Sequence, residues 1–163
     1  MIPQFLIGIG QDSHRLVAAD QGEVLTLAGV PFDCGLKLEA NSDGDVIIHA
    51  LYNAISTSLG GGSLGVVADK MCADGIVDSK KYLQAVLDLM SKRHYRLNNV
   101  SISVEALQPR LEKYFPYMKS SLAKICHLSP TQVGLSVTSG EGLTRFGKGE
   151  GMSVFVSVLL ERE

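Results

Sequence analysis

The hydrophobic positions of this chain change period several times, and each change predicts a change of secondary structure. Apolar residues alternate with polar ones in a half-buried strand, and they recur every three or four positions on the buried face of a helix. Alternation predicts strands over residues 6–14, 23–32, 33–40, 97–107, 131–139 and 151–161. Helical spacing predicts helices over residues 43–59, 78–95 and 109–128.

Turn and cap residues refine these limits. A glycine turn between residues 23–32 and 33–40 predicts a hairpin. Ser42 or Asp43 is the expected N-cap of the first helix, and Pro116 either begins or kinks the third. The glycine-rich residues 60–78 have no regular period, which indicates a functional or mobile loop.

The order of these elements predicts an α+β fold in which helices pack on one face of a mixed β-sheet. The chain has 163 residues, of which 45% are hydrophobic. This is enough apolar material for one ordinary core, so we expect residues 1–163 to form a single domain.

Charge and cysteine usage exclude several function classes. The net charge is −2 with both signs interspersed, so nothing favours binding to nucleic acid or to an anionic membrane. No apolar stretch reaches membrane-spanning length, and the first residues lack the pattern of a signal peptide. Cys34, Cys72 and Cys126 are widely spaced and odd in number, unlike a secreted disulfide framework. We therefore expect a cytoplasmic protein.

The stretch "GIGQDSHRL" contains an acid and a histidine two positions apart in a predicted strand. Alternate side chains of a strand share a face, so Asp12 and His14 point the same way, while Gln11 and Ser13 point the other way. Such a pair either begins a metal site or is a hydrogen-bonded histidine beside an unrelated acid.

His49, in the first predicted helix, is a candidate third ligand. Two imidazoles and one carboxylate with an open position are typical of a catalytic zinc site. Asp45 and Asn53 lie one turn before and after His49, so either could hold its second nitrogen. From the residues alone, His49 could equally pack in a helix interior.

Four motifs occur in a familiar order: "GIGQDSHRL", "SDGDVIIHAL", "NNVSISVEALQPRL" and "VTSGEGLTRFGKGEG". Together they resemble the 2-C-methyl-D-erythritol 2,4-cyclodiphosphate synthase family of the non-mevalonate isoprenoid pathway, over nearly the whole chain. The resemblance implies a homotrimer with each active site between adjacent subunits. It also implies one Zn²⁺ per subunit, held by Asp12, His14 and His49.

The implied reaction converts 4-diphosphocytidyl-2-C-methyl-D-erythritol 2-phosphate into 2-C-methyl-D-erythritol 2,4-cyclodiphosphate and CMP. The 2-phosphate attacks the β-phosphorus, and because this nucleophile is already anionic, positioning and cations matter more than a strong base. Glu141 matches the family glutamate that holds a second divalent ion, Mg²⁺ or Mn²⁺. Asn41 and Ser139 fall at the positions expected to be catalytic.

The resemblance also assigns a set of substrate contacts. Residues 106–111 match the loop that lines the cytidine pocket, residues 63–65 match the loop that contacts the methylerythritol, and Thr138 and Ser139 match a pair that contacts the diphosphate. Lys148 and Glu150 match residues at the threefold axis, beside a cavity able to take an isoprenoid diphosphate. The substrate-binding set is Asp12, His14, Asn41, Ser42, Ser63, Leu64, Gly65, Asp69, Ala106, Leu107, Gln108, Pro109, Arg110, Leu111, Thr138, Ser139, Glu141, Arg145 and Lys148.

Several of these positions depart from the family pattern. Asn41 replaces a phosphate-binding histidine and Ser63 replaces an aspartate, while residues 66–74 lack the usual Phe-Pro-Asp, for which Asp69 is the substitute. Gly140 replaces a threonine. Arg145 replaces a phenylalanine. Lys148 replaces an arginine, which keeps the charge but not the bidentate geometry.

Two other functions compete with the cyclase. One is a zinc-dependent hydrolase of phosphate esters or nucleotides, which would use the same three ligands with a zinc-bound hydroxide. The other is a trimeric binder of isoprenoid diphosphates without catalysis, favoured if the changes at Asn41 and Ser63 have disabled the chemistry.

Overall fold

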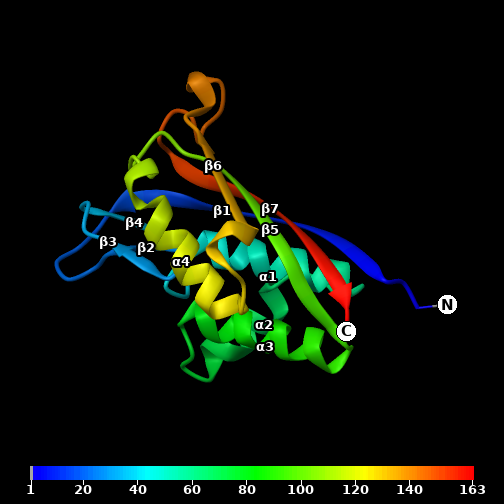
Figure 1. Cartoon of the computed structure of the whole chain (residues 1–163). Coiled ribbons are helices and arrows are strands. Elements are labelled where there is room, and N and C mark those ends of the chain that lie inside the picture. Colours follow the sequence, from blue (N-terminus) through cyan, green and yellow to red (C-terminus); the bar gives the residue numbers. More distant parts are fainter. Residues whose placement is uncertain (1) are drawn as a thin grey trace.

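A five-stranded mixed sheet, in the order β4-β1-β7-β5-β6, carries the fold (Figure 1). The coordinates are a computed structural model and describe residues 2–163. The strands are β1 (Phe5–Ala18), β2 (Leu25–Leu27), β3 (Val30–Phe32), β4 (Leu36–Leu38), β5 (Tyr95–Glu105), β6 (Val133–Thr138) and β7 (Gly151–Arg162). The helices are α1 (Val46–Ser58), α2 (Gly65–Ala73), α3 (Ser79–Lys92) and α4 (Phe115–Cys126), with short 3₁₀ turns η1 (Glu112–Tyr114), η2 (Pro130–Gln132) and η3 (Gly140–Gly142).

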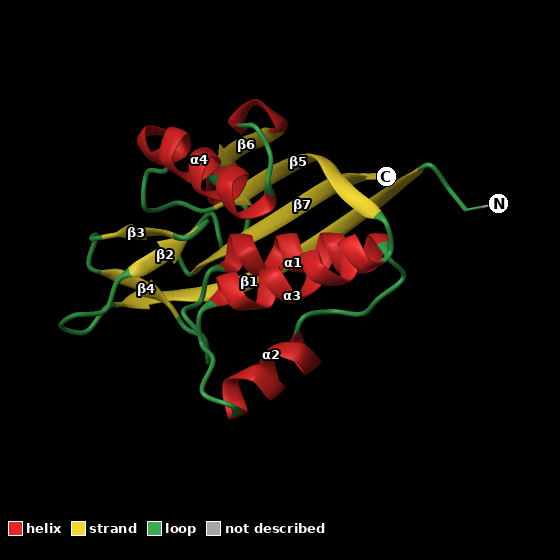
Figure 2. Ribbon diagram, turned by 60° about the horizontal axis from the view of Figure 1, so that its bottom comes forward, coloured by secondary structure: helices red, strands yellow, loops and turns green. Residues whose placement is uncertain are grey.

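The sheet is mixed because β5 and β6 run parallel while the other pairs are antiparallel. Figure 2 shows α1 and α3 lying against the sheet, with α4 beside β6. Buried residues alternate along β5 and β7, so one face of the sheet forms the core beneath the helices. The predicted α+β fold with a mixed sheet is confirmed.

Two glycines of β1 bring α1 unusually close to the sheet. A Cβ atom on Gly8 would lie 1.9 Å from the backbone oxygen of Ala54, and one on Gly10 would lie 2.0 Å from that of Ala50. Any larger residue would push α1 away. These glycines therefore set the distance between α1 and the end of β1 that carries Asp12 and His14.

The other face of the sheet exposes large apolar side chains on β1 and β7, beside polar residues of β5 and β6 such as Ser101, Ser103 and Ser136. Phe5, Ile7 and Ile9 of β1 are 52%, 72% and 66% exposed, and Phe155 of β7 is 54% exposed. Their register places them on one face, since Gln11 pairs with Phe155 and Ile9 pairs with Ser157. A contiguous exposed apolar surface of this kind is typical of an interaction surface.

The predicted hairpin is displaced. Its two strands are β2 and β3, joined at Ala28 and Gly29, whose φ angles of 56° and 72° fit the tight turn of a two-residue hairpin. The segment around Gly35 does not close a hairpin, because β4 pairs with β1. Alternation over residues 23–32 therefore spans two short strands rather than one.

Two predictions about the first helix and the following loop are also wrong. Asp45, not Ser42 or Asp43, is the N-cap of α1, because the backbone turns at Gly44 with a φ of 71°. Residues 65–73 form α2 inside the predicted loop. No residue of this helix is fully buried, and the helical spacing of its partly buried Val67, Ala68, Met71 and Cys72 covers little more than one turn, which is a weak signal.

The two remaining helices lie inside their predicted ranges of 78–95 and 109–128, although α4 begins only at Phe115, after the 3₁₀ turn η1. Asp78 caps α3, and Pro116 lies in the first turn of α4, where its missing N–H has no intrahelical partner to lose. Among the described residues, no helix is both long enough and apolar enough to cross a membrane.

Candidate active site

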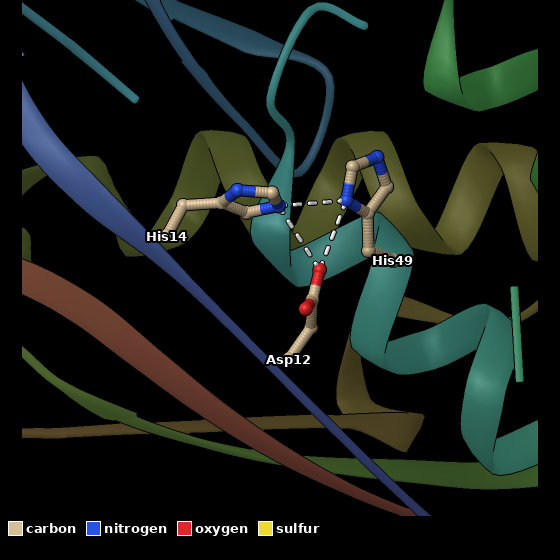
Figure 3. Close-up of side chains that lie close together, drawn as sticks. All are labelled: Asp12, His14 and His49. Carbon is tan, nitrogen blue, oxygen red and sulfur yellow. Dashed lines mark hydrogen bonds and ion pairs between the residues drawn. The ribbon is translucent and has the colours of Figure 1, made fainter. Parts of the chain in front are cut away.

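Three potential metal ligands meet where β1 passes under α1. Asp12 and His14 come from β1 and His49 from the end of the first turn of α1, and their side chains converge (Figure 3). One ligand atom from each side chain lies within 4.8 Å of the other two. The structure thus brings together the three residues that the sequence analysis selected as a ligand set.

The spacing of these atoms suits a small ion. Asp12 Oδ2 lies 3.1 Å from His14 Nε2 and 3.0 Å from His49 Nδ1, and the two nitrogens lie 3.2 Å apart. A tetrahedral ion with bonds of about 2.0–2.1 Å holds neighbouring donors about 3.3 Å apart. The triad therefore matches one triangular face of a tetrahedral site, and its donors fit a divalent ion such as zinc.

The charges of the triad reinforce one another. Burial alone would raise the pKa of Asp12, but hydrogen bonds and charges from His14 and His49 hold it well below its usual range. Burial would lower the pKa of His14, yet the hydrogen bond with Asp12 and its charge raise it overall. Asp12 is thus an anionic carboxylate that favours cationic groups beside it.

The outward nitrogens of the two imidazoles have separate partners. His14 Nδ1 lies 3.0 Å from the backbone oxygen of Glu39. His49 Nε2 lies 2.8 Å from Ser79 Oγ and 3.3 Å from Ser42 Oγ. Sequence reasoning missed Ser79, because a serine at the start of a helix is an ordinary N-terminal residue that carries no signal of a contact 30 positions away.

The predicted partners of His49, Asp45 and Asn53, are wrong. Asp45 is fully buried and accepts hydrogen bonds from the backbone N–H groups of Ala28, Gly29 and Ile48. Burial raises the pKa of Asp45 to about 6, against the opposing effect of these bonds. Its role is to join α1 to the β2–β3 turn.

Asn53 is likewise occupied elsewhere. Its amide nitrogen donates to the backbone oxygen of Gln11, and its amide oxygen accepts from the N–H of Leu64. Asn53 therefore connects β1, α1 and the segment that leads into α2.

A cavity of about 350 Å³ opens beside the triad. It is lined by Gln11, Asp12, His14, Ala40, Asn41, Ser42, His49, Asn53, Ser63, Leu64, Gly65, Ala68 and Cys72. The structure thus gathers the triad, residues 41–42 and residues 63–65 around one space. Asp69 is exposed on α2 and does not line this cavity.

The other predicted contacts form a second cluster at the ends of β5 and β6. The N–H of Ala106 donates to the backbone oxygen of Thr138, which places residues 106–111 beside the end of β6. Ser139 caps η3 and donates from its hydroxyl to Glu141 Oε1 at 3.2 Å. Ala106 and Leu111 are buried, whereas Leu107, Gln108, Arg110 and Glu141 are exposed.

Arg145, Lys148 and Glu150 lie in the loop before β7. Arg145 forms an ion pair with Glu150, with 2.5 Å between Nη2 and Oε2. Arg145 and Glu150 also border a small cavity with Ser13 and Arg15. Lys148 is exposed and has no ion pair among the described residues.

The two clusters are separated across the sheet. Ser13 pairs with Ser153, Ser153 with Glu105, and Glu105 with Thr138, so Ser13 and Thr138 lie in one row. Three strand spacings place them about 14 Å apart. Within one chain, the strand that carries Asp12 and His14 is therefore separated by two strands from the end of β6, which leads to Glu141.

The structure is thus an α+β protein with a mixed sheet and a candidate metal site beside a cavity. The family model described as the YgbB family matches residues 5–161. The chain belongs to this family.

The relatives of the chain carry one name. A 2-C-methyl-D-erythritol 2,4-cyclodiphosphate synthase of Chlamydia trachomatis serovar L2b is 38% identical over 152 residues, covering 93% of this chain and 85% of the relative. The resemblance inferred from the motifs is confirmed.

Solved structures agree with this assignment. The bifunctional IspDF from Campylobacter jejuni is 30% identical, with a TM-score of 0.88 over 98% of this chain and 42% of that one. A 2C-methyl-D-erythritol-2,4-cyclodiphosphate synthase in its CDP-bound form is 28% identical, with a TM-score of 0.84 over 95% of this chain and 99% of that one.

Proposed function

We propose that this chain is a 2-C-methyl-D-erythritol 2,4-cyclodiphosphate synthase, a cyclising lyase that releases CMP. Its substrate is 4-diphosphocytidyl-2-C-methyl-D-erythritol 2-phosphate, an intermediate of the non-mevalonate isoprenoid pathway. The observation that carries the proposal is the Asp12–His14–His49 triad beside a cavity, in a chain whose relatives carry this name.

The reaction makes one phosphorus–oxygen bond and breaks another. An oxygen of the 2-phosphate bonds to the β-phosphorus, the bond from that phosphorus to the bridging oxygen breaks, and CMP leaves with the electron pair. The nucleophile is already an anion, so the protein must chiefly align it and offset charge.

The cavity residues perform the alignment. Asp12, His14 and His49 would hold zinc, which when bound supplies a Lewis acid toward the β-phosphate. Asn41 and Ser42 border the same cavity and orient phosphate oxygens as uncharged hydrogen-bonding groups. Residues 63–65 border it on the α2 side and contact the methylerythritol.

The second cluster binds the nucleotide end. Residues 106–111 form the cytidine pocket, and Thr138 and Ser139 contact the diphosphate. Glu141 would hold Mg²⁺ or Mn²⁺, since a carboxylate and phosphate oxygens are hard ligands. A structural neighbour described as a CDP-bound synthase supports a nucleotide ligand.

The active site lies between adjacent subunits of a homotrimer. The separation of about 14 Å between the two clusters supports this, because a neighbour must supply the second cluster to the first. The exposed apolar sheet face of Phe5, Ile7, Ile9 and Phe155 supplies a surface for association. Light scattering of the purified protein should give the mass of three chains.

At the trimer axis, Lys148 with Arg145 and Glu150 borders a cavity for an isoprenoid diphosphate. Lys148 offers an unpaired positive charge, while the Arg145–Glu150 pair is internally neutral. We expect the protein to act in the cytosol, where Cys34, Cys72 and Cys126 would remain free thiols, as they are here.

The direct test is turnover of the proposed substrate, followed by phosphorus NMR with and without zinc and magnesium. Wild type should give CMP and the cyclic diphosphate. The activity of His49→Ala should be at least about 1,000-fold lower than that of wild type, because one of the three metal ligands is missing. His127→Asn is the matched control, since it removes an exposed imidazole at a left-handed position that asparagine tolerates.

The same experiment in ¹⁸O-water separates the competing functions. Cyclisation adds no solvent oxygen, whereas a zinc-dependent hydrolase would incorporate ¹⁸O into its product. A folded, zinc-loaded protein that binds isoprenoid diphosphate but gives no product would instead be a binder. Either result would contradict the proposed cyclase.

A further inference from the structure

The two ring nitrogens of His49 face different surroundings. Nδ1 points to the ligand atoms of Asp12 and His14, at 3.0 and 3.2 Å. Nε2 points away from the cavity toward Ser79 Oγ, at 2.8 Å. His49 is 5% exposed as a whole residue and Ser79 is completely buried, so bulk water does not substitute for this contact.

The direction of the His49–Ser79 hydrogen bond follows from Asp43. Ser79 Oγ makes a short contact with Asp43 Oδ1, and the Ser79 backbone N–H donates to Asp43 Oδ2 at 3.1 Å. A carboxylate accepts only, so the single hydroxyl proton of Ser79 goes to Asp43. Ser79 Oγ can then only accept from His49, which requires a proton on Nε2.

Asp43 is itself held in place. Its Oδ1 accepts from the backbone N–H of Asp45 at 3.2 Å, and its own N–H donates to the backbone oxygen of Val77 at 2.9 Å. These bonds join the start of α1 to the segment before α3. The carboxylate therefore faces Ser79 from a fixed position.

We propose that Asp43 and Ser79 form a positioning pair that keeps the proton of His49 on Nε2 and presents the Nδ1 lone pair to the metal. This inference rests on the proposed metal site. His14 uses the other ring nitrogen: its Nδ1 faces the Glu39 carbonyl, so its Nε2 would be the ligand atom. The two imidazoles would thus bind the metal through different nitrogens. In each, the hydrogen bond made by the other nitrogen decides which one is free to bind.

Ser42 is a weaker partner of the same nitrogen. Its hydroxyl lies 3.3 Å from His49 Nε2 and also accepts from the N–H of Gly44 at 3.2 Å. Because Ser42 lines the cavity, substrate phosphate competes for it. Ser79 does not line the cavity and is free for this one role.

Two variants test the pair. Ser79→Ala removes the acceptor. Asp43→Asn is nearly isosteric, but its amide N–H cannot accept from Ser79, so one of the two Ser79 bonds is lost in either amide orientation. Both should bind zinc 10–100-fold more weakly than wild type, the usual cost of losing such an outer partner. Ser58→Ala, a buried serine of α1 whose hydroxyl donates to the Ile55 carbonyl, should bind zinc as wild type does.

Zinc affinity is measured by chelator competition on folded protein, and the His49 Nε2–H is followed by ¹H–¹⁵N NMR of the zinc-loaded protein. Wild type should show an Nε2–H protected from solvent exchange, and Ser79→Ala should lose that protection. Zinc affinity within twofold of wild type in both variants, or an Nε2 without a proton in wild type, would overturn the pair.

These outcomes are distinct from failure of the proposed function. A wild type that holds zinc with a protected Nε2–H but forms no cyclic product contradicts the cyclase and supports the pair. An active cyclase whose zinc affinity is the same in Asp43→Asn and Ser79→Ala contradicts the pair alone.

Discussion

The ligand triad between β1 and α1 and the segment of residues 139–150 after β6 are built differently. The triad is enclosed by regular elements, with His49 buried and its Nε2 hydrogen-bonded. In residues 139–150, Glu141 adopts a left-handed φ of 49° and the side chain of Leu143 is 85% exposed. One chain thus completes the triad, whereas residues 139–150 leave Glu141 and Leu143 exposed.

This difference explains why a single chain does not form the proposed active site. Rigid elements position the triad to within the spacing of a metal site. The 139–150 segment is an irregular loop, held by turn hydrogen bonds of its own backbone and by side-chain contacts such as those of Thr144 with Glu105 and of Arg145 with Glu150. A neighbouring subunit would cover Leu143 and receive Glu141.

The largest expected effect comes from Gly10→Ala, which disturbs only the first region. The added methyl group would lie 2.0 Å from the Ala50 carbonyl, so α1 must move away from β1. Chemical denaturation should show a loss of about 3 kcal/mol or more in the free energy of unfolding. Zinc affinity should fall as well, because His49 moves with α1.

Gly134→Ala is the matched control in β6. Its added methyl group would have its nearest neighbour at 3.7 Å, an ordinary contact. Its unfolding free energy should stay within about 0.5 kcal/mol of wild type. Equal losses in the two variants would mean that the close approach of α1 to β1 does not matter.

The next effect comes from Glu141→Gln, which disturbs only the second region. Turnover should fall about 100-fold, since a neutral amide is a poorer ligand for the second ion. Zinc affinity and thermal stability should not change, because Glu141 is exposed and is not one of the three candidate zinc ligands. Glu112→Gln, another exposed glutamate at the start of a 3₁₀ turn, should have full activity. Loss of zinc binding in Glu141→Gln would show that the two regions are not separate.

The smallest effect concerns pH and Asp45. Burial raises its pKa to about 6 in the folded protein, from 3.8. Between these values the folded state binds more protons than the unfolded state, so this carboxyl makes stability fall as pH rises. From pH 4.5 to pH 7 its contribution should decrease by about 2 kcal/mol.

Asp45→Asn removes that contribution and keeps the other titrating groups. Urea denaturation of both proteins at the two pH values should show the wild type losing about 2 kcal/mol more than the variant over this range. An identical pH dependence would mean that Asp45 titrates as an exposed acid does.

The sequence predicts the first region better than the second. Alternation along β1 places Asp12 and His14 on one face, and the 3.6-residue period predicts the helix that carries His49. These are local rules, so they hold without knowledge of the tertiary fold. The choice of His49 as the third ligand rests instead on the family resemblance. The Asp45 cap, by contrast, depends on the backbone turn at Gly44 and on the distant N–H groups of Ala28 and Gly29.

Other features leave no local signal. The helix α2 leaves only a weak signal, because the helical spacing of Val67, Ala68, Met71 and Cys72 covers little more than one turn and none of them is fully buried. The contact of Ser79 with His49 joins the starts of α1 and α3, and only packing of those helices creates it. The placement of Glu141 beside a neighbour's triad rests on the family resemblance and on the spacing across the sheet.

The central claim is that the triad of one subunit works with Glu141 of the next. The most direct test mixes two inactive variants, His49→Ala and Glu141→Gln, by unfolding and refolding them together, and measures cyclic diphosphate by phosphorus NMR. Random trimers should place an intact triad beside an intact Glu141 at about a quarter of the sites, so about a quarter of wild-type activity should return. If the mixture is no more active than the separate variants although mixed trimers have formed, the site lies within one chain and the account is wrong.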